Sequence, residues 1–184
     1  MAQFFTIHPD NPQPRLIKQA AELVRAGAVI AYPTDSCYAL GCHLGDKDAV
    51  ARIRQIRGVD DKHHMTLVCR DLSELARYAR VDNVQFRLLK NNTPGSYTFI
   101  LQATKEVPKR LQHPKRNTVG IRIPDHPVAL ALLKELGEPL LSATLILPGE
   151  EHPLNDAQEI FDRLGHLLDV VLDGGATHLT PTTV

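Results

Sequence analysis

The sequence predicts an α/β (α+β) fold, in which a twisted mixed sheet has helices packed on it. Three observations favour this class: short apolar runs alternate with segments of helical periodicity, some strand-like runs follow one another directly, and prolines and glycines separate the elements. The chain of 184 residues has the length of one domain and contains neither an internal repeat nor a long linker. We therefore expect a single domain over residues 1–184.

The N-terminal part is expected to contain a strand, a helix and a second strand. The first strand lies at 4–8 and stops at the following proline. Apolar residues recur at helical spacing over 14–26, and Gly27 provides the C-terminal stop. The compact apolar run at 28–32 then predicts a strand that ends at Pro33.

The middle of the chain continues this alternation. Asp46 is a suitable N-cap for a helix over 46–57, and Gly58 is its terminator. A strand at 66–69 and two helices, at 71–78 and 83–89, are predicted next.

A turn at Pro94-Gly95 introduces the C-terminal half. Strands are predicted at 97–102 and 118–123, and Pro124 halts the second of them. The remaining elements are a helix at 126–136, a strand at 140–147, a helix at 156–164 and a strand at 168–172.

Composition and termini favour a cytoplasmic protein that does not associate with membranes. The apolar runs are too short to span a bilayer, and the N-terminus lacks the basic start and apolar run of a secretory signal. Three cysteines without a close C-x-x-C pair favour reduced thiols. We expect no structural metal, because the spacing of cysteines and histidines between Cys37 and Cys69 matches no common zinc pattern.

Charge is unevenly distributed, although the formal net charge is zero. The segment 105–116 carries five basic residues against one acidic residue, and a second basic group lies around Arg54. One end of the fold is therefore expected to be positive and suited to RNA phosphates. The candidate RNA-binding residues are Arg52, Arg54, Lys109, Arg110, Lys115 and Arg116. The alternative is that these side chains form ordinary solvated faces.

The segment Tyr32-Pro33-Thr34-Asp35-Ser36 lies where a buried strand is expected to end. Ligands collect at the carboxyl ends of strands in open α/β folds, and Thr34 and Ser36 offer hydroxyl groups and backbone amides there. In a second interpretation, Asp35 only anchors the turn. On its own, this segment is a weak indication of a binding site.

Together with further segments, it resembles the YrdC-like family, whose members make threonylcarbamoyl-adenylate, and the YciO branch of that family in particular. The matching segments, in the family's order, are 38–42, the basic helix end at Arg57, 94–98, 119–124 followed by His126-Pro127, 140–144 and 181–184. The resemblance covers nearly the whole chain. The family normally continues past the last of these segments, so its C-terminal extension is expected to be absent here.

The resemblance implies a concave, positively charged cleft and a nucleotidyltransferase activity. Family enzymes condense L-threonine, bicarbonate and ATP, with Mg²⁺ on the phosphates, into threonylcarbamoyl-AMP and pyrophosphate. The product feeds the threonylcarbamoyl-adenosine modification of tRNA. Binding of double-stranded RNA has also been attributed to the cleft surface of the family.

By position, the family's roles fall on hydroxyl-bearing and basic residues of this chain. The resemblance assigns the amino-acid substrate to Thr34, Ser142 and Thr183, and the nucleotide to Arg57, Thr98, Arg122 and Thr144. Arg57 and Lys62 would supply the catalytic charge. Such a reaction needs positioning and cationic stabilisation rather than a protein nucleophile, and these residue types can provide both.

Two signatures of the family's catalytic enzymes are altered. Arg57-Gly58-Val59 stands at the K-x-R signature, and Thr144-Leu145-Ile146 stands at the S-x-N signature. Loss of one preorganised transition-state donor typically lowers the rate by about 10²–10³. Lys62, His63 or Arg70 in the following loop could supply the missing charge. Three functions therefore stay open: an adenylating enzyme, an RNA- or ribosome-binding module that kept the cleft and lost the chemistry, or a plain structural or interaction domain.

Overall fold

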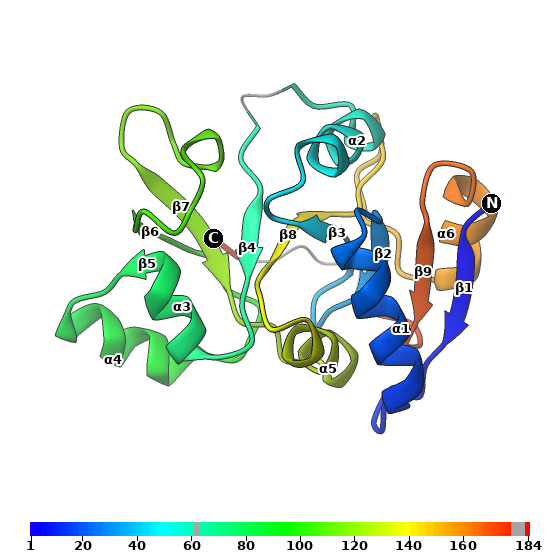
Figure 1. Cartoon of the computed structure of the whole chain (residues 1–184), viewed down its shortest axis with the longest axis horizontal. Helices are drawn as coiled ribbons and strands as arrows, with labels where there is room; N and C mark the ends of the chain where they lie inside the picture. Colours follow the sequence, from blue (N-terminus) through cyan, green and yellow to red (C-terminus); the bar gives the residue numbers. More distant parts are fainter. Residues whose placement is uncertain (61–62, 178–182) are drawn as a thin grey trace.

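The computed structural model describes residues 1–60, 63–177 and 183–184, within which nine strands form one mixed sheet (Figure 1). The strands are β1 (Gln3–Thr6), β2 (Ile30–Pro33), β3 (Tyr38–His43), β4 (Thr66–Val68), β5 (Ala79–Arg80), β6 (Phe99–Ala103), β7 (Thr118–Arg122), β8 (Leu140–Thr144) and β9 (Val170–Asp173). Their order across the sheet is β1-β9-β2-β3-β8-β4-β7-β6-β5. Strand β9 is parallel to β1 and β2, β4 is parallel to β7, and the other neighbours are antiparallel. The predicted fold class is confirmed.

Within the same residues, six α-helices connect the strands close to the predicted positions. They are α1 (Pro14–Arg25), α2 (Lys47–Arg57), α3 (Leu72–Tyr78), α4 (Asn83–Asn92), α5 (Pro127–Leu136) and α6 (Ala157–Leu164). Four of them start at an aspartate whose carboxylate accepts a hydrogen bond from an amide of the first turn: Asp46, Asp71, Asp82 and Asp156. None of the described helices is long and apolar enough to cross a membrane.

Strand β3 is the principal element that the sequence does not predict. Its residues are buried from Tyr38 to Cys42, so apolar and polar side chains do not alternate as they do in a half-buried strand. Gly41 also interrupts the run, and glycine is depleted in strands. The two-residue strand β5 is too short to produce a pattern, and α4 continues past its predicted end at Leu89 to Asn92.

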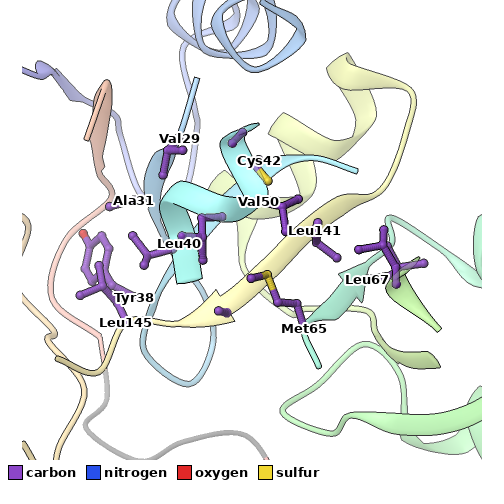
Figure 2. Packing of buried hydrophobic residues seen from close by; sticks show 14 of the residues in the cluster. Val29, Ala31, Tyr38, Leu40, Cys42, Val50, Met65, Leu67, Leu141 and Leu145 are labelled. Carbon is purple, nitrogen blue, oxygen red and sulfur yellow. The ribbon is translucent and has the colours of Figure 1, made fainter. Parts of the chain in front are cut away.

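Alternate residues of the central strands pack on opposite faces of the sheet. Val29 and Ala31 belong to a cluster with α2, α3 and α6, whereas Ile30 and Tyr32 belong to a cluster with α1 and α5. Figure 2 shows the first cluster, in which side chains of β3, β8 and α2 gather. The two layers of helices thus cover opposite faces.

Part of the second face is not covered by α1 and α5. Strand pairing links Gly41 of β3 to Ser142 of β8, and continues from Ser142 to Thr66 of β4, Gly120 of β7 and Ile100 of β6. Paired residues point to the same side of a sheet, so these residues form one row. The row contains small or hydroxyl-bearing residues until Ile100, which is 57% exposed. Two residues of this row, Thr66 and Ser142, line the candidate site.

The start of α5 is capped by a histidine. Nδ1 of His126 accepts a hydrogen bond from the amide of Val128 at 3.1 Å, so this nitrogen is unprotonated. Burial lowers the pKa of His126 below its ordinary value of 6.5 in the folded chain. The unfolded chain therefore binds this proton more readily than the folded chain does.

We expect the free energy of unfolding to fall as the pH drops below 6.5, because the unfolded chain then takes up a proton at His126. His63, whose pKa is also lowered by burial, contributes in the same direction. Urea unfolding of the wild type and of His126→Asn at several pH values separates the contribution of His126 from that of His63, since asparagine caps the helix without titrating. A pH dependence that is identical in both proteins would show that His126 does not contribute.

Candidate functional site

A hollow of about 130 Å³, which we call the cleft, lies on the uncovered face of the sheet. Four hydroxyl side chains line it, together with Arg122 and Val184: Thr66, Thr98, Ser142 and Thr144. The structure thus brings four residues predicted from the sequence, Thr98, Arg122, Ser142 and Thr144, to one place. Thr66 was not predicted as a site residue, because a single threonine in a three-residue strand carries no pattern of its own.

A buried hydrogen bond orients Ser142 in the cleft wall. The hydroxyl oxygens of Tyr32 and Ser142 lie 2.6 Å apart. Burial raises the pKa of Tyr32 to about 12, so its hydroxyl group stays protonated at neutral pH. The Tyr32 ring lies against Gly41, where a Cβ atom would come within 2.9 Å of ring carbon Cε1. Glycine at position 41 therefore leaves the space that this ring needs.

The turn after β2 is held by the hydroxyl group of Thr34. Its Oγ1 donates to the carbonyl oxygen of Cys37 at 2.6 Å and accepts from the amides of Ser36 and Cys37, each at 3.2 Å. Thr34 is only 2% exposed. Its role in binding the amino-acid substrate stays a prediction, and the structure adds a structural role for the same hydroxyl group.

We expect Thr34→Val to lower the free energy of unfolding by about 2 kcal/mol, because the turn amides and the Cys37 carbonyl lose a buried partner. Thr34→Ser keeps the hydroxyl group and should lose much less. Urea unfolding followed by circular dichroism measures both variants. If the valine variant were as stable as the serine variant, the hydroxyl group would not be holding the turn.

An ion pair ties this turn to the strand that carries Arg122. Nη2 of Arg122 contacts Oδ1 of Asp35, and both side chains are largely buried. Nε of Arg122 lies 3.4 Å from the carbonyl oxygen of Gly95, whose amide donates to the carbonyl of Ile123. Asp35 therefore does more than anchor its own turn. Arg122, which the resemblance assigns to the nucleotide, is engaged with protein groups in this structure.

Thr183 and Val184 lie at the edge of the cleft beside segment 94–98. The carbonyl of Thr183 accepts from the amide of Thr98 at 2.7 Å, and its amide donates to the carbonyl of Ser96 at 3.0 Å. The role of Thr183 in binding the amino-acid substrate stays a prediction. Lys62, predicted to be catalytic, lies outside the described residues, as do Pro181 and Thr182 of the matching segment 181–184.

Arg57 at the end of α2 reaches the end of β8. Its Nη1 donates to the carbonyl oxygen of Thr144 at 2.8 Å, and burial lowers the pKa of its guanidinium group. The buried Nε of Arg57, like that of Arg54, has no hydrogen-bond partner among the described residues. A buried cationic donor without a partner is costly, and the Arg57 side chain as a whole is only half-buried.

The described part of the following loop does not supply a second cation beside Arg57. Nε of Arg70 lies 3.6 Å from Asp71 and 3.9 Å from Glu74, at the start of α3, and Arg70 does not line the cleft. Burial, and to a smaller extent the positive charge of Arg57, lower the pKa of His63. His63 is therefore mainly neutral at neutral pH.

The predicted RNA-binding residues differ in their surroundings. Arg52 forms an ion pair with Asp169 at 2.7 Å and donates to the carbonyl of Leu167, which neutralises its charge. Arg110 donates to the carbonyl of Leu44 at 3.0 Å. A hollow of about 700 Å³ is lined by the basic residues Lys109, Arg110 and Lys115 and by the stacked rings of His64 and His113. Arg116 is exposed on the same segment, and Arg54 is half-buried.

Among the described residues, no group of three or more histidine, cysteine, aspartate or glutamate side chains is placed to hold a metal ion. The three cysteines are buried and free. Burial raises the pKa of each of their thiols, so they stay protonated at neutral pH and act as packing residues.

Similar sequences extend over the whole chain. The family model Sua5_yciO_yrdC, described as "Telomere recombination", matches residues 22–184. Uncharacterized protein YciO of Escherichia coli (strain K12) is 60% identical over 184 residues, which are 100% of this chain and 89% of that protein. Threonylcarbamoyl-AMP synthase of Halorhodospira halophila is 30% identical over 90% of this chain and 86% of its own length.

Solved structures share this fold. The crystal structure of E. coli YciO has a TM-score of 0.95 at 60% identity, and the match covers 99% of this chain and 88% of that one. The crystal structure of P. abyssi Sua5 complexed with L-threonine has a TM-score of 0.86, over 95% of this chain and 51% of that one. At 24% identity, this second likeness bears on the fold alone.

Proposed function

Because the chain belongs to the Sua5/YciO/YrdC family, we propose that its cleft forms an acyl-adenylate from ATP. The proposed substrates are L-threonine, bicarbonate and ATP with Mg²⁺. The proposed product is threonylcarbamoyl-AMP or a related acyl-adenylate, which would feed tRNA modification. Sequence similarity to threonylcarbamoyl-AMP synthases supports this reaction class.

One observation carries the proposal, namely the contact between Arg57 and Thr144. It joins the end of α2 to the end of β8 and leaves the buried Nε of Arg57 without a partner among the described residues. A phosphate oxygen that reached the half-buried guanidinium group of Arg57 would form a charge-assisted hydrogen bond with it. The same interaction would stabilise the negative charge that develops on the phosphates during adenylation.

The proposed reaction requires no covalent intermediate with the protein. The threonine amine and carbon dioxide from bicarbonate form a carbamate, and a carbamate oxygen attacks the α-phosphorus of ATP. The bond from the α-phosphorus to the bridging oxygen breaks, and pyrophosphate leaves with that oxygen. In this scheme, Arg57 faces the phosphates, and the hydroxyl groups of Ser142 and Thr66 orient the acyl group.

The altered signatures favour a slow enzyme. Val59 stands where the family has its second cation, and Ile146 stands where it has an amide. Because each lost donor lowers the rate by about 10²–10³, turnover well below that of an intact family enzyme is part of the proposal.

The test is pyrophosphate release from ATP with Mg²⁺ by the purified protein, combined with calorimetric titration of ATP. Release that requires both L-threonine and bicarbonate, together with ATP affinity that rises when L-threonine is present, would support the proposal. ATP binding without pyrophosphate release would make the cleft a binding site only. Absence of both would overturn the proposal.

A second function, binding of duplex RNA, tRNA or the ribosome, is favoured by the hollow beside Lys109, Arg110 and Lys115. Phosphate contacts would dominate its affinity, so RNA binding should weaken by orders of magnitude between about 50 and 200 mM salt. The measurement is titration of duplex RNA at both salt concentrations, with Lys115→Gln as the variant. Affinity that did not depend on salt would contradict this function.

A further inference from the structure

A second hollow, of about 420 Å³, lies beyond the carboxyl ends of the neighbouring parallel strands β4 and β7. The start of α3, the end of α4 and the first half of α5 surround it, and Figure 1 shows these helices along one edge of the molecule. Among the described residues, it shares no lining residue with the cleft. Ligands of α/β folds bind preferentially beyond the carboxyl ends of strands, so this hollow is a candidate for a separate site.

Two cationic side chains line this hollow from different elements. Arg70 follows β4, and Lys90 lies in the last turn of α4. The ion pairs of Arg70 span 3.6 and 3.9 Å, which is longer than a hydrogen bond. Within the described part of the chain, the ammonium group of Lys90 has neither an ion pair nor a hydrogen bond. Both side chains therefore retain donors for a ligand.

The two nearby carboxylates are engaged with backbone amides. Oδ1 of Asp71 accepts from the amide of Glu74 at 2.8 Å and caps α3. Oε1 of Glu74 accepts from the amide of Arg70 at 2.9 Å, and Glu74 is buried rather than part of the lining. The local charge that faces the hollow is therefore positive on balance, with two cations against the carboxylate of Asp71.

The rest of the lining is largely apolar. Ile123 is buried, and Leu72 and Leu130 are half-buried beside it. The hydroxyl groups come from Ser73 and from Thr93, which already donates to the carbonyl of Leu89. Apolar walls with a few convergent polar groups, in a volume of about 300–1,000 Å³, are typical of sites for small molecules.

We propose that this hollow binds a small amphipathic anion, a carboxylate with a short apolar tail. The fork of Arg70 and the ammonium group of Lys90 would donate to the carboxylate. The tail would pack against Leu72, Ile123 and Leu130. The proposal for this hollow does not depend on the adenylation proposal, because the hollow and the cleft are lined by different residues.

The test is a titration of ¹⁵N-labelled protein with sodium hexanoate, followed through the amide chemical shifts. We expect saturable shifts that concentrate at residues 70–73, 90–94 and 123. Hexan-1-ol, which has the same tail without the charge, is the matched ligand and should bind more weakly. If hexan-1-ol bound as tightly as hexanoate, Arg70 and Lys90 would not contribute to binding, and the proposal would be wrong.

Two lysine variants complete the test. Lys90 and Lys134 are both exposed and both lie in the last turn of a helix, but only Lys90 lines the hollow. We expect Lys90→Gln to weaken hexanoate binding about fivefold, and Lys134→Gln to leave it unchanged. Equal effects of the two substitutions, or hexanoate shifts centred elsewhere in the chain, would overturn the proposal.

Discussion

Replacing Arg122 by methionine is expected to lower the free energy of unfolding by about 3–5 kcal/mol. The side chain of Asp35 is only 15% exposed, and the substitution would leave its carboxylate without the cation it contacts. A buried charge without a partner is far more costly than the pair itself. Urea unfolding at neutral pH measures this loss directly.

A double variant separates the lost ion pair from the lost packing of the long side chain. Asp35→Asn combined with Arg122→Met removes both charges, and it should recover much of the stability lost in Arg122→Met alone. Arg77→Met is the control, because Arg77 is exposed on α3. If Arg122→Met were no less stable than Arg77→Met, the ion pair would not be holding the turn after β2 to β7.

Arg57→Gln is expected to reduce ATP affinity about 30-fold, which corresponds to about 2 kcal/mol. The glutamine side chain is too short to donate both to the Thr144 carbonyl and to a phosphate, and it carries no charge. If the protein forms an adenylate, the rate of pyrophosphate release should fall by about 10² or more. Calorimetry with ATP and Mg²⁺ measures the first effect, and a pyrophosphate assay measures the second.

Two further variants make this result specific to the guanidinium group. Arg77→Gln removes another arginine from the last turn of a helix, outside the cleft, and should leave ATP binding unchanged. Arg57→Lys keeps the charge and loses the planar fork, so its affinity should lie between those of the wild type and Arg57→Gln. ATP affinity that was the same in Arg57→Gln and Arg77→Gln would exclude Arg57 from the phosphate site.

Local signals account for most of what the sequence predicts about the fold. The start of α2 is predictable because aspartate, here Asp46, is a preferred N-cap. Its end is predictable because glycine commonly terminates helices, and Gly58 adopts the left-handed conformation of such a terminator, with φ of 67°. Strand β3 escapes prediction because its pattern depends on burial from both faces, which only the assembled sheet provides. Boundaries depend in the same way on partners: β8 ends at Thr144 although the apolar run continues to Leu147.

The candidate site depends more strongly on contacts between distant segments. Motif positions could be carried over from the family resemblance, and Thr98, Arg122, Ser142 and Thr144 do meet at the cleft. The partners of these residues could not be predicted, because Arg122 contacts Asp35 across 87 positions and Arg57 contacts Thr144 across 87 positions. The internal hydrogen bonds of Thr34 could not be predicted either, since the sequence does not show which way a hydroxyl group points.

The position of β9 between β1 and β2 has a consequence for the synthesis of the chain. Strands β1 and β2 lie near the start of the chain, whereas β9 lies near its end. In the described sheet, β1 pairs with β9. Segments that are far apart in sequence associate slowly, because a long loop must close before their contacts form. During translation, β1 therefore leaves the ribosome long before its partner exists. Its free backbone groups are open to association with other nascent chains until residues 170–173 emerge.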